Sequence, residues 1–204
     1  MEPILHGIIL AFGLILPLGV QNVFVFSQGV TQPRFIKALP ATITASICDT
    51  ILILLAVLGI SMIVLQFEWI RLILLVGGIL FLLYMGKVIW QSGAASLEGK
   101  DALPIKKQIL FALSVSLLNP HALLDIIGVI GTSAIKYNGQ DQLLFMVACI
   151  VVSWMWFFGL TISGAFLKKM QIPNRVFILF NKLSALFIWG TAVYLLVGLF
   201  YFEH

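Results

Sequence analysis

Charged residues are scarce in this sequence. Only 10% of the 204 residues are Asp, Glu, Lys or Arg, whereas 61% are hydrophobic, and the mean hydropathy is +1.12. Because a soluble domain carries about a quarter charged residues, this composition argues against a soluble globular protein. At roughly 20 apolar residues per membrane crossing, the length suits about six transmembrane helices and leaves no room for a second, soluble domain.

Several kinds of chemical motif are missing as well. The two cysteines, Cys48 and Cys149, lie within apolar runs and form neither a zinc-binding spacing nor a disulfide framework. No motif places a nucleophile or a metal beside a base, so we expect neither an enzyme nor a bound cofactor. No Lys or Arg precedes Arg34, and the first apolar run lacks a small-x-small cleavage site. We therefore expect that run to be retained as a helix.

The apolar residues gather into segments that predict an all-α polytopic membrane protein with six transmembrane helices. These segments span about residues 4–27, 39–65, 69–90, 109–131, 142–166 and 177–202. Only the third connection, at about 91–108, is long, and its polar composition is expected of a joint between two halves. We therefore expect a single transmembrane domain over residues 1–204, with a first half at about 1–90 and a second half at about 109–204.

The basic residues lie almost entirely on one side of the predicted membrane. The first, third and fifth connections and their flanks hold Arg34, Lys37, Lys87, Lys100, Lys106, Lys107, Lys168, Lys169 and Arg175. The opposite side holds only Arg71 and Lys136. Because Lys and Arg concentrate in cytoplasmic loops, we expect both termini to lie outside the cytoplasm. The same distribution accounts for the net charge of +4 without a nucleic-acid partner.

Two prolines indicate that the halves are repeats. Pro17 interrupts the first segment and Pro120 interrupts the fourth, at similar depths and 103 residues apart. The same offset places Asp49 opposite Val152 and Ser153. With three crossings in each half, such a repeat is inverted in the membrane. Inverted halves with broken first and fourth helices are typical of alternating-access transporters whose site lies near the midplane.

The stretch from Ser116 to Asp125 places polar groups inside an otherwise apolar segment. Pro120 frees backbone carbonyls, which within a membrane must face protein or a watery cavity. His121 and Asp125 are four residues apart and therefore share one face of a helix. Either they satisfy each other through a hydrogen bond at the kink, or they form a titrating pair near a binding site.

Asp49 lies in the middle of the second segment, with no basic residue near it in the sequence. An ionisable group at that depth costs a few kcal/mol or more, so it indicates a functional site. The alternative is a protonated carboxyl group that bonds to a neighbouring helix. Gln21, Asn22 and Asn119 lie beside the two breaks, where amides either satisfy freed backbone groups or hold the carboxylate or ammonium of a zwitterion. Asn181, near the cytoplasmic end of the sixth segment, fits an interfacial anchor or a gate.

The fifth segment combines small and aromatic residues. Gly159 and Ser163 provide a flat surface that predicts close helix packing. Trp154 and Trp156 lie in the middle of the segment, where tryptophan is less typical than at the membrane interface. Either they pack against lipid and neighbouring helices, or one of them stacks on a guanidinium group.

Several stretches match one set of motifs in order. They are Leu16 to Phe24, Asp49, Leu118 to His121 with Asp125, Trp156 to Leu160, and Asn181. The first resembles the first-helix motif LPLGPQN of the lysine/arginine exporter (LysE) family, with Val20 in place of the second proline. The fourth-segment stretch resembles the LNPH…D element of the same family, and the other residues fall where similar ones occur.

The resemblance implies a six-helix exporter of basic amino acids, L-arginine or L-lysine, in the inner membrane of a bacterium. Relatives in this family also move neutral amino acids such as threonine and homoserine, and more distant ones move metal ions. A divalent-metal exporter would use His121, Asp125 and Asp49 as ligands. The sequence lacks a His-rich cytoplasmic loop, so we expect no metal site and keep this substrate as an alternative.

We therefore expect one amino acid to bind between the broken first and fourth helices. The substrate-binding residues are predicted to be Gln21, Asn22, Asp49, Asn119, His121, Asp125 and Asn181. Within this set Asp49, His121 and Asp125 would also exchange the substrate cation for a proton. One proton in for one cation out moves no net charge across the membrane. The expected partners are the amino acid, protons and the lipid bilayer, and the sequence leaves a homodimer open.

Overall fold

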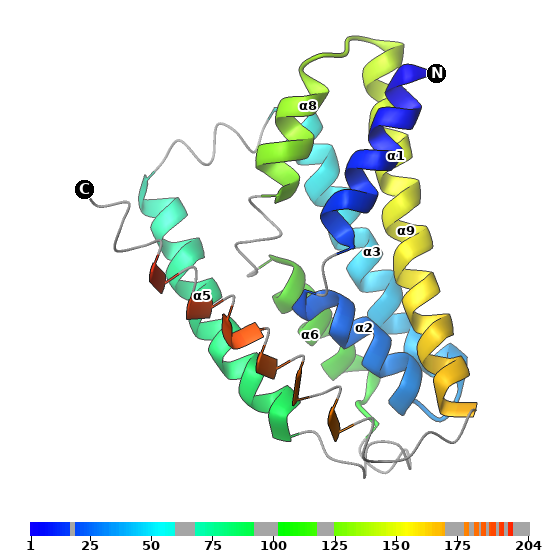
Figure 1. The fold of residues 1–204 in the computed structure, drawn as a ribbon, viewed down its shortest axis with the longest axis vertical. Helices are drawn as coiled ribbons and strands as arrows, with labels where there is room; N and C mark the ends of the chain where they lie inside the picture. Colours follow the sequence, from blue (N-terminus) through cyan, green and yellow to red (C-terminus); the bar gives the residue numbers. More distant parts are fainter. Residues whose placement is uncertain are drawn as a thin grey trace.

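The computed structural model is helical throughout the part of the chain that it describes (Figure 1). The structure describes residues 1–16, 19–59, 68–91, 102–117 and 125–169, together with residues 178–179, 182–183, 185–186, 188–190, 192–193 and 196–197. These described residues contain no strand, so the all-α prediction is confirmed. The arrangement as six helices in two inverted repeats stays a prediction.

The first predicted segment contains two helices instead of one. α1 spans Glu2–Ile15 and α2 spans Val20–Thr31, and the two are bent by 80° relative to each other (Figure 1). Gly19 precedes α2 in an extended conformation. Pro17, to which we assign the break, lies outside the described residues. The second helix begins inside the bundle, because the side chains of its first residues, Val20 to Asn22, are buried.

α5 and the helices α6 and η2 correspond to the third and fourth predicted segments, and the short α8 follows in the predicted connection after the fourth. α5 spans Glu68–Gln91, α6 spans Ile105–Leu117, the π-helix η2 spans Asp125–Gly131 and α8 spans Thr132–Ala134. α6 begins within the predicted third connection, because Pro104 accepts a 3.0 Å hydrogen bond from the Gln108 backbone. Proline suits the start of a helix, where its missing N–H needs no partner. Pro120 lies outside the described residues.

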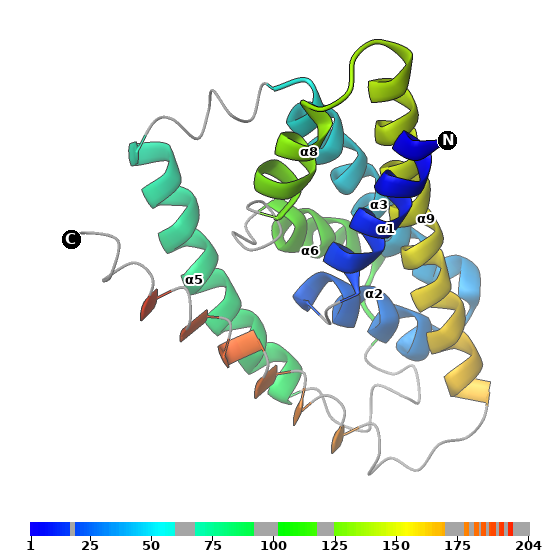
Figure 2. The same ribbon diagram turned by 45° about the horizontal axis from the view of Figure 1, so that its top comes forward.

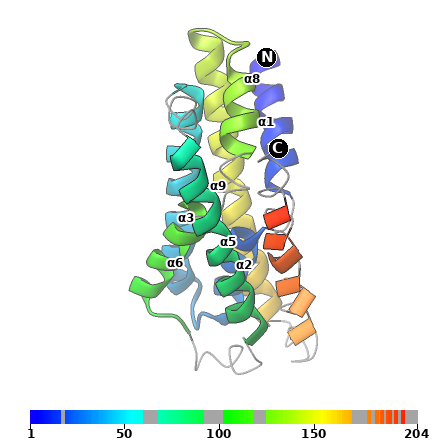
Figure 3. The ribbon, with the colours of Figure 1, turned by 90° about the vertical axis from the view of Figure 1, so that its left-hand side faces the viewer.

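Two long helices run through most of the length of the bundle (Figure 3). α3 spans Phe35–Val57 and α9 spans Gln140–Lys169, and the two pack against each other. Within the described chain, both are long and apolar enough to cross a membrane, and the bent pair α1 and α2 is a third candidate span. α9 also packs against α1 and α2, whereas α3 also packs against α6 and η2.

Polar side chains lie buried inside the bundle among apolar ones, and large apolar side chains cover its surface. The buried polar residues include Gln21, Asn22, Gln28, Gln32, Thr42, Ser46, Asp49, Gln108, Ser116, Ser153 and Thr161. On the outer face of α3, Ile43, Ile47 and Ile51 recur every four residues and are 38%, 45% and 48% exposed. This inverted distribution is expected of helices whose outer surface faces lipid and whose polar groups face one another.

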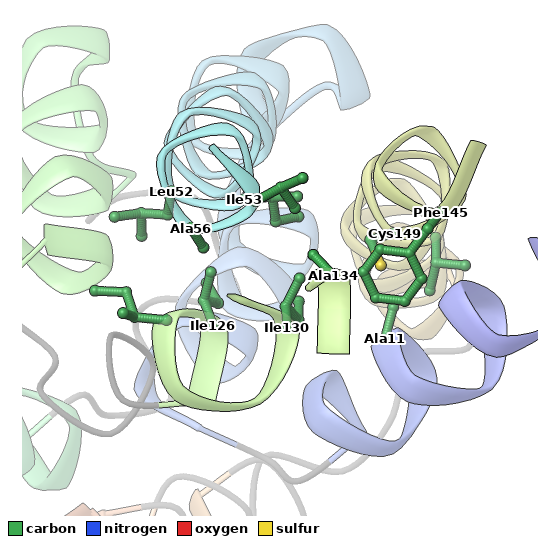
Figure 4. Packing of buried hydrophobic residues seen from close by; sticks show 12 residues of the cluster. Ala11, Leu52, Ile53, Ala56, Ile126, Ile130, Ala134, Phe145 and Cys149 are labelled. Atoms are coloured by element: carbon green, nitrogen blue, oxygen red, sulfur yellow. The ribbon is translucent and has the colours of Figure 1, made fainter. Parts of the chain in front are cut away.

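Three apolar clusters hold the helices together and leave a polar layer between two of them. In the first, Ile126 and Ile130 of η2 face Leu52 and Ala56 of α3, with α1 and α9 alongside (Figure 4). The second joins α2, α5 and α6 to described residues between 185 and 192, which lie beside α5 (Figure 2). The third joins α2, α3, α6 and α9. Along α3 the first and third clusters lie on either side of Asp49.

α2 and α9 cross at a point where neither helix has room for a side chain. A Cβ atom added at Gly29 would collide with the backbone of Thr161, and one added at Gly164 would collide with the Phe26 carbonyl. The predicted packing surface of Gly159 and Ser163 is wrong within the described residues, because both are exposed. The close contact lies at Gly164, one residue further along α9 and therefore about 100° around the helix from Ser163.

This crossing predicts that Gly164→Ala destabilises the protein. The added methyl group must push α2 away from α9, and overpacking of this kind costs about 1–3 kcal/mol. We expect a melting temperature lower by several degrees in detergent micelles. Gly159→Ala on the same helix is the control, because a Cβ there meets nothing within 4 Å. Equal stability of Gly164→Ala and the parent would contradict the close crossing.

Candidate functional site

Asp49 lies at the centre of the polar layer, on α3. Its side chain is only 6% exposed. The Gln21 amide nitrogen donates a 3.1 Å hydrogen bond to Oδ1, and the Ser153 hydroxyl donates a 2.9 Å hydrogen bond to Oδ2. Both carboxyl oxygens are therefore held, one by α2 and the other by α9.

The break in the first segment places the Gln21 donor. Gln21 lies in the first turn of α2, directly after the bend. The 80° bend between α1 and α2 gives this turn a direction different from that of α1, and it brings Gln21 within hydrogen-bond distance of Asp49. The positive end of the α2 dipole lies at the same turn, and it favours negative charge nearby. Ser153 lies near the middle of α9, so Asp49 is bonded from both sides at the same depth.

The donors around Asp49 are neutral. No Lys, Arg or His of the described residues forms an ion pair with this carboxyl group; its described partners are an amide and a hydroxyl. Removing a carboxylate from water costs several kcal/mol, and two neutral hydrogen bonds offset only part of that cost. The arrangement therefore favours arrival of a proton or of a cation at Asp49.

Two tryptophans of α9 bond to residues next to Asp49 and Gln21. The Trp154 indole N–H donates a 2.9 Å hydrogen bond to Thr50, the neighbour of Asp49 in sequence. The Trp156 indole N–H donates a 3.3 Å hydrogen bond to the Asn22 side-chain oxygen. Phe12 of α1 packs edge-on against Trp156, with ring centroids 6.3 Å apart. These contacts fix the indole groups beside the polar layer. The hypothesis that one of them stacks on a guanidinium group stays a prediction.

Asn22 bridges the break between α1 and α2. Its amide nitrogen donates a 2.7 Å hydrogen bond to the Ile15 carbonyl, the last residue of α1. Carbonyls at the end of a helix lack intrahelical partners. Asn22 therefore satisfies a freed backbone group, which is one of the two roles that the sequence allows. Its role in holding substrate stays a prediction.

The structure brings together some of the predicted site residues. Asp49 and Gln21 are in direct contact, and Asn22 is adjacent to Gln21. Asp125 is the first residue of η2, and its side chain lies outside what the structure describes. The other predicted positions, Asn119, His121 and Asn181, lie outside the described residues, so their roles stay predictions.

Ser153 and Thr50 are the residues that sequence reasoning did not select for the site. The offset between the prolines did place Asp49 opposite Val152 and Ser153, so that spacing carried a signal for Ser153. A serine within an apolar helix is common, and nothing in its local sequence marks it as a carboxylate donor. Thr50 likewise is linked to the site only by the hydrogen bond that it accepts from Trp154.

The described residues contain no group of three His, Cys, Asp or Glu side chains that could hold a metal ion. The predicted alternative of a metal site needs His121, which lies outside these residues. What the described site offers is one carboxylate with amide, hydroxyl and indole groups around it. Such a set suits a hydrogen-bonding organic cation as well as a proton.

Comparison with known proteins gives consistent matches over nearly the whole chain. The family model for LysE type translocators matches residues 12–199. A protein of Bacillus subtilis (strain 168), provisionally named amino-acid transporter YisU, is 52% identical over 201 residues, which cover 98% of this chain and 91% of that protein. The arginine exporter protein ArgO of Shigella flexneri is 32% identical over 183 residues, which cover 84% of this chain and 85% of that protein. ArgO of Escherichia coli (strain K12) is 29% identical over 195 residues, which cover 93% of this chain and 91% of that protein. No solved structure matches this chain significantly.

The bond between Ser153 and Asp49 gives a prediction that needs no substrate. Ser153→Ala leaves Oδ2 without a described donor, so we expect a lower melting temperature in detergent. The loss should vanish in an Asp49→Ala background, giving a coupling energy of about 1.5–3 kcal/mol for a hydrogen bond to a charged group. Ser163→Ala, at an exposed serine of the same helix, is the matched control. Equal effects of Ser153→Ala with and without Asp49 would contradict the contact.

Proposed function

The chain belongs to the LysE type translocator family, and on that basis we propose that it exports a basic amino acid, L-arginine or L-lysine, from the bacterial cytoplasm. Membership confirms the resemblance seen in the sequence motifs. The names of the ArgO relatives make arginine the first substrate to test.

The observation that carries the proposal is the buried, uncompensated carboxylate of Asp49. It lies within a helix that is long and apolar enough to cross a membrane. Its described partners are neutral hydrogen-bond donors. A positively charged side chain that reaches this group gains a charge-assisted hydrogen bond and cancels the buried charge. A neutral amino acid can offer only its α-ammonium group, and because it has no net charge, the buried negative charge stays uncompensated.

Charge also explains why the exporter needs a coupling ion. Moving one cation outward against an inside-negative potential costs about 2.3 kcal/mol per 100 mV. If Asp49 holds either the substrate cation or a proton, a proton that arrives from outside displaces the substrate. The carboxyl group then returns in neutral form. His121 and Asp125 would tune or relay this proton, and Gln21, Asn22, Asn119 and Asn181 would orient the substrate.

Reciprocal packing supports alternating access. The broken first segment, α1 and α2, packs against α9, and the fourth segment, α6 and η2, packs against α3. In an inverted repeat α3 and α9 are equivalent, so each half would place its first helix on the second helix of the other half. The Asp49–Ser153 bond then joins the two halves close to their axis. Sites at such an interface suit exchange between two orientations.

Transport by inverted membrane vesicles tests the substrate. Vesicles containing the protein should take up labelled arginine or lysine, and Asp49→Asn should lower this uptake at least about tenfold, because a buried cation without its partner costs several kcal/mol. Asp141→Asn is the matched control, since that carboxylate is exposed at the start of α9.

Labelled threonine and a divalent metal should be measured in the same vesicles. Arginine and lysine uptake that is unchanged in Asp49→Asn would contradict charge recognition. Uptake of threonine alone, or of the metal alone, would replace the basic substrate by the corresponding alternative.

The proton exchange predicts a response to the pH gradient. In inverted vesicles the interior corresponds to the outside of the cell, so an acidic interior should drive arginine uptake. Nigericin, which removes the pH gradient, should abolish the stimulation. Valinomycin with equal potassium on both sides should leave it intact, because one-for-one exchange moves no net charge. Uptake that follows the membrane potential and ignores the pH gradient would exclude this coupling.

A further inference from the structure

A group of buried glutamines closes the end of the bundle that is predicted to face the cytoplasm. We call the side chains of Gln28, Gln32 and Gln108 the amide cluster; they are 4%, 4% and 0% exposed. α2 and α9 end here, and α3 and α6 begin here (Figure 3). The hydropathy pattern of the sequence assigns the three glutamines to connections between helices, because their side chains are polar.

The amide cluster ties these helix ends together. The Gln32 amide nitrogen donates to the Leu103 carbonyl at 2.9 Å and to the Gln28 side-chain oxygen at 3.1 Å. The Gln108 amide nitrogen donates to the Leu103 carbonyl at 2.8 Å and to the Lys37 carbonyl at 3.0 Å. The Lys168 ammonium donates to the Gln32 carbonyl at 2.8 Å.

When α2 is paired with α9, and α3 with α6, the bonds divide into those within a pair and those between the two pairs. α2 and α9 form one pair, joined by the Gly29 crossing and by the Lys168 bond. α3 and α6 form the other, joined by their packing and by the bond from Gln108 to Lys37, although α3 packs against α9 as well. The polar contacts from one pair to the other are few, and they must break together with part of the apolar packing of α3 against α9 if the pairs separate at this end.

The contacts between the pairs form three layers along α3. At the end of the bundle, Gln32 bonds to the Leu103 carbonyl. Further in, the hydroxyls of Thr42 and Thr161 bond at 2.7 Å, and both side chains are fully buried. Deepest lies Asp49 with its donors on α2 and α9. Asp49 follows Lys37 by twelve residues, which is about 18 Å along a helix.

We propose that the amide cluster and the Thr42–Thr161 pair are the cytoplasmic gate, which opens when α2 and α9 separate from α3 and α6. The proposal rests on the proposed transport function, because a gate needs a substrate path. It assigns to Gln32, Gln108 and Thr42 a role distinct from substrate binding. According to this proposal, the structure is in a state that is closed at the end formed by the amide cluster.

The chemistry of the gate suits repeated opening. The bonds of the amide cluster and of the Thr42–Thr161 pair join neutral amide, hydroxyl and carbonyl groups, so no charge has to be moved or protonated when these bonds break. The Gln108 side-chain oxygen is buried and has no partner among the described residues. A buried acceptor without a partner raises the free energy of the closed state, and opening allows water to reach it. The unpaired acceptor therefore lowers the free-energy cost of opening the amide cluster.

Thiol labelling of Cys48 tests the gate. Cys48 is adjacent to Asp49 and 3% exposed, and a Cys149→Ala background leaves it as the single thiol. In inverted vesicles a membrane-impermeant maleimide reaches the protein from the cytoplasmic face. Gln32→Leu should raise the labelling rate roughly two- to tenfold, the population change expected from one lost hydrogen bond. Thr42→Val, which removes the inner bond at constant volume, should act in the same direction.

The opposite end of the bundle offers a matched control. Gln142 is also a partly buried amide, and it donates a 3.3 Å hydrogen bond to the Val57 carbonyl. Gln142→Leu should leave labelling from the cytoplasmic face unchanged. The gate is contradicted if Gln32→Leu and Thr42→Val both label at the parent rate while they retain the parent melting temperature. Equal acceleration from both faces of the membrane would indicate general loosening and would also overturn it.

Labelling requires no substrate, so the gate and the transported molecule are tested separately. Faster labelling in Gln32→Leu, combined with no uptake of arginine or lysine, would retain the gate and overturn the proposed substrate. Arginine uptake that depends on Asp49, combined with unchanged labelling, would retain the function and overturn the gate.

Discussion

The structure depends on one unfavourable placement, a carboxylate that is nearly without contact with water in the middle of an apolar helix. Asp49 can exist there only because Gln21 and Ser153 approach it from two other helices. That requirement explains the bend between α1 and α2, which brings the first turn of α2 to the carboxylate. It also explains why α9 lies against both α2 and α3. The apolar clusters on either side exclude water from this layer and increase the strength of its hydrogen bonds.

Sequence reasoning predicted the helices well because lipid imposes a simple rule on their surfaces. Apolar runs of about 20 residues had to be helices, and α5 and α9 lie within a few residues of the predicted segments, whereas α3 ends at Val57, well before the predicted end at about 65. The largest differences are at helix ends. Gln28 and Gln108 were assigned to connections, but both lie within helices, where they are buried and bonded. A hydropathy pattern cannot distinguish a polar residue in water from one that is satisfied by a neighbouring helix.

The candidate site was predictable for a different reason. A carboxylate or a proline within an apolar run is costly, so Asp49 and Pro17 attract attention without any structure. Ser153 and the threonine pair carry no such cost, since a hydroxyl in a helix can bond to its own backbone. Their importance comes from what lies opposite them, which is a property of helix packing alone. The role of Asn22 illustrates the same limit: its sequence position fits two functions, and the bond to Ile15 identifies one of them.

The Asp49 cluster is built from residues of both halves of the chain, and this has a consequence for how the two halves depend on each other. Asp49 and Gln21 come from the first half, whereas Ser153 comes from the second. Neither half alone contains the complete set. In the inverted repeat that the sequence predicts, each half needs a partner in the opposite orientation to complete such a cluster. The cluster then exists only where both halves are assembled, so that a change in either half acts on the same carboxylate.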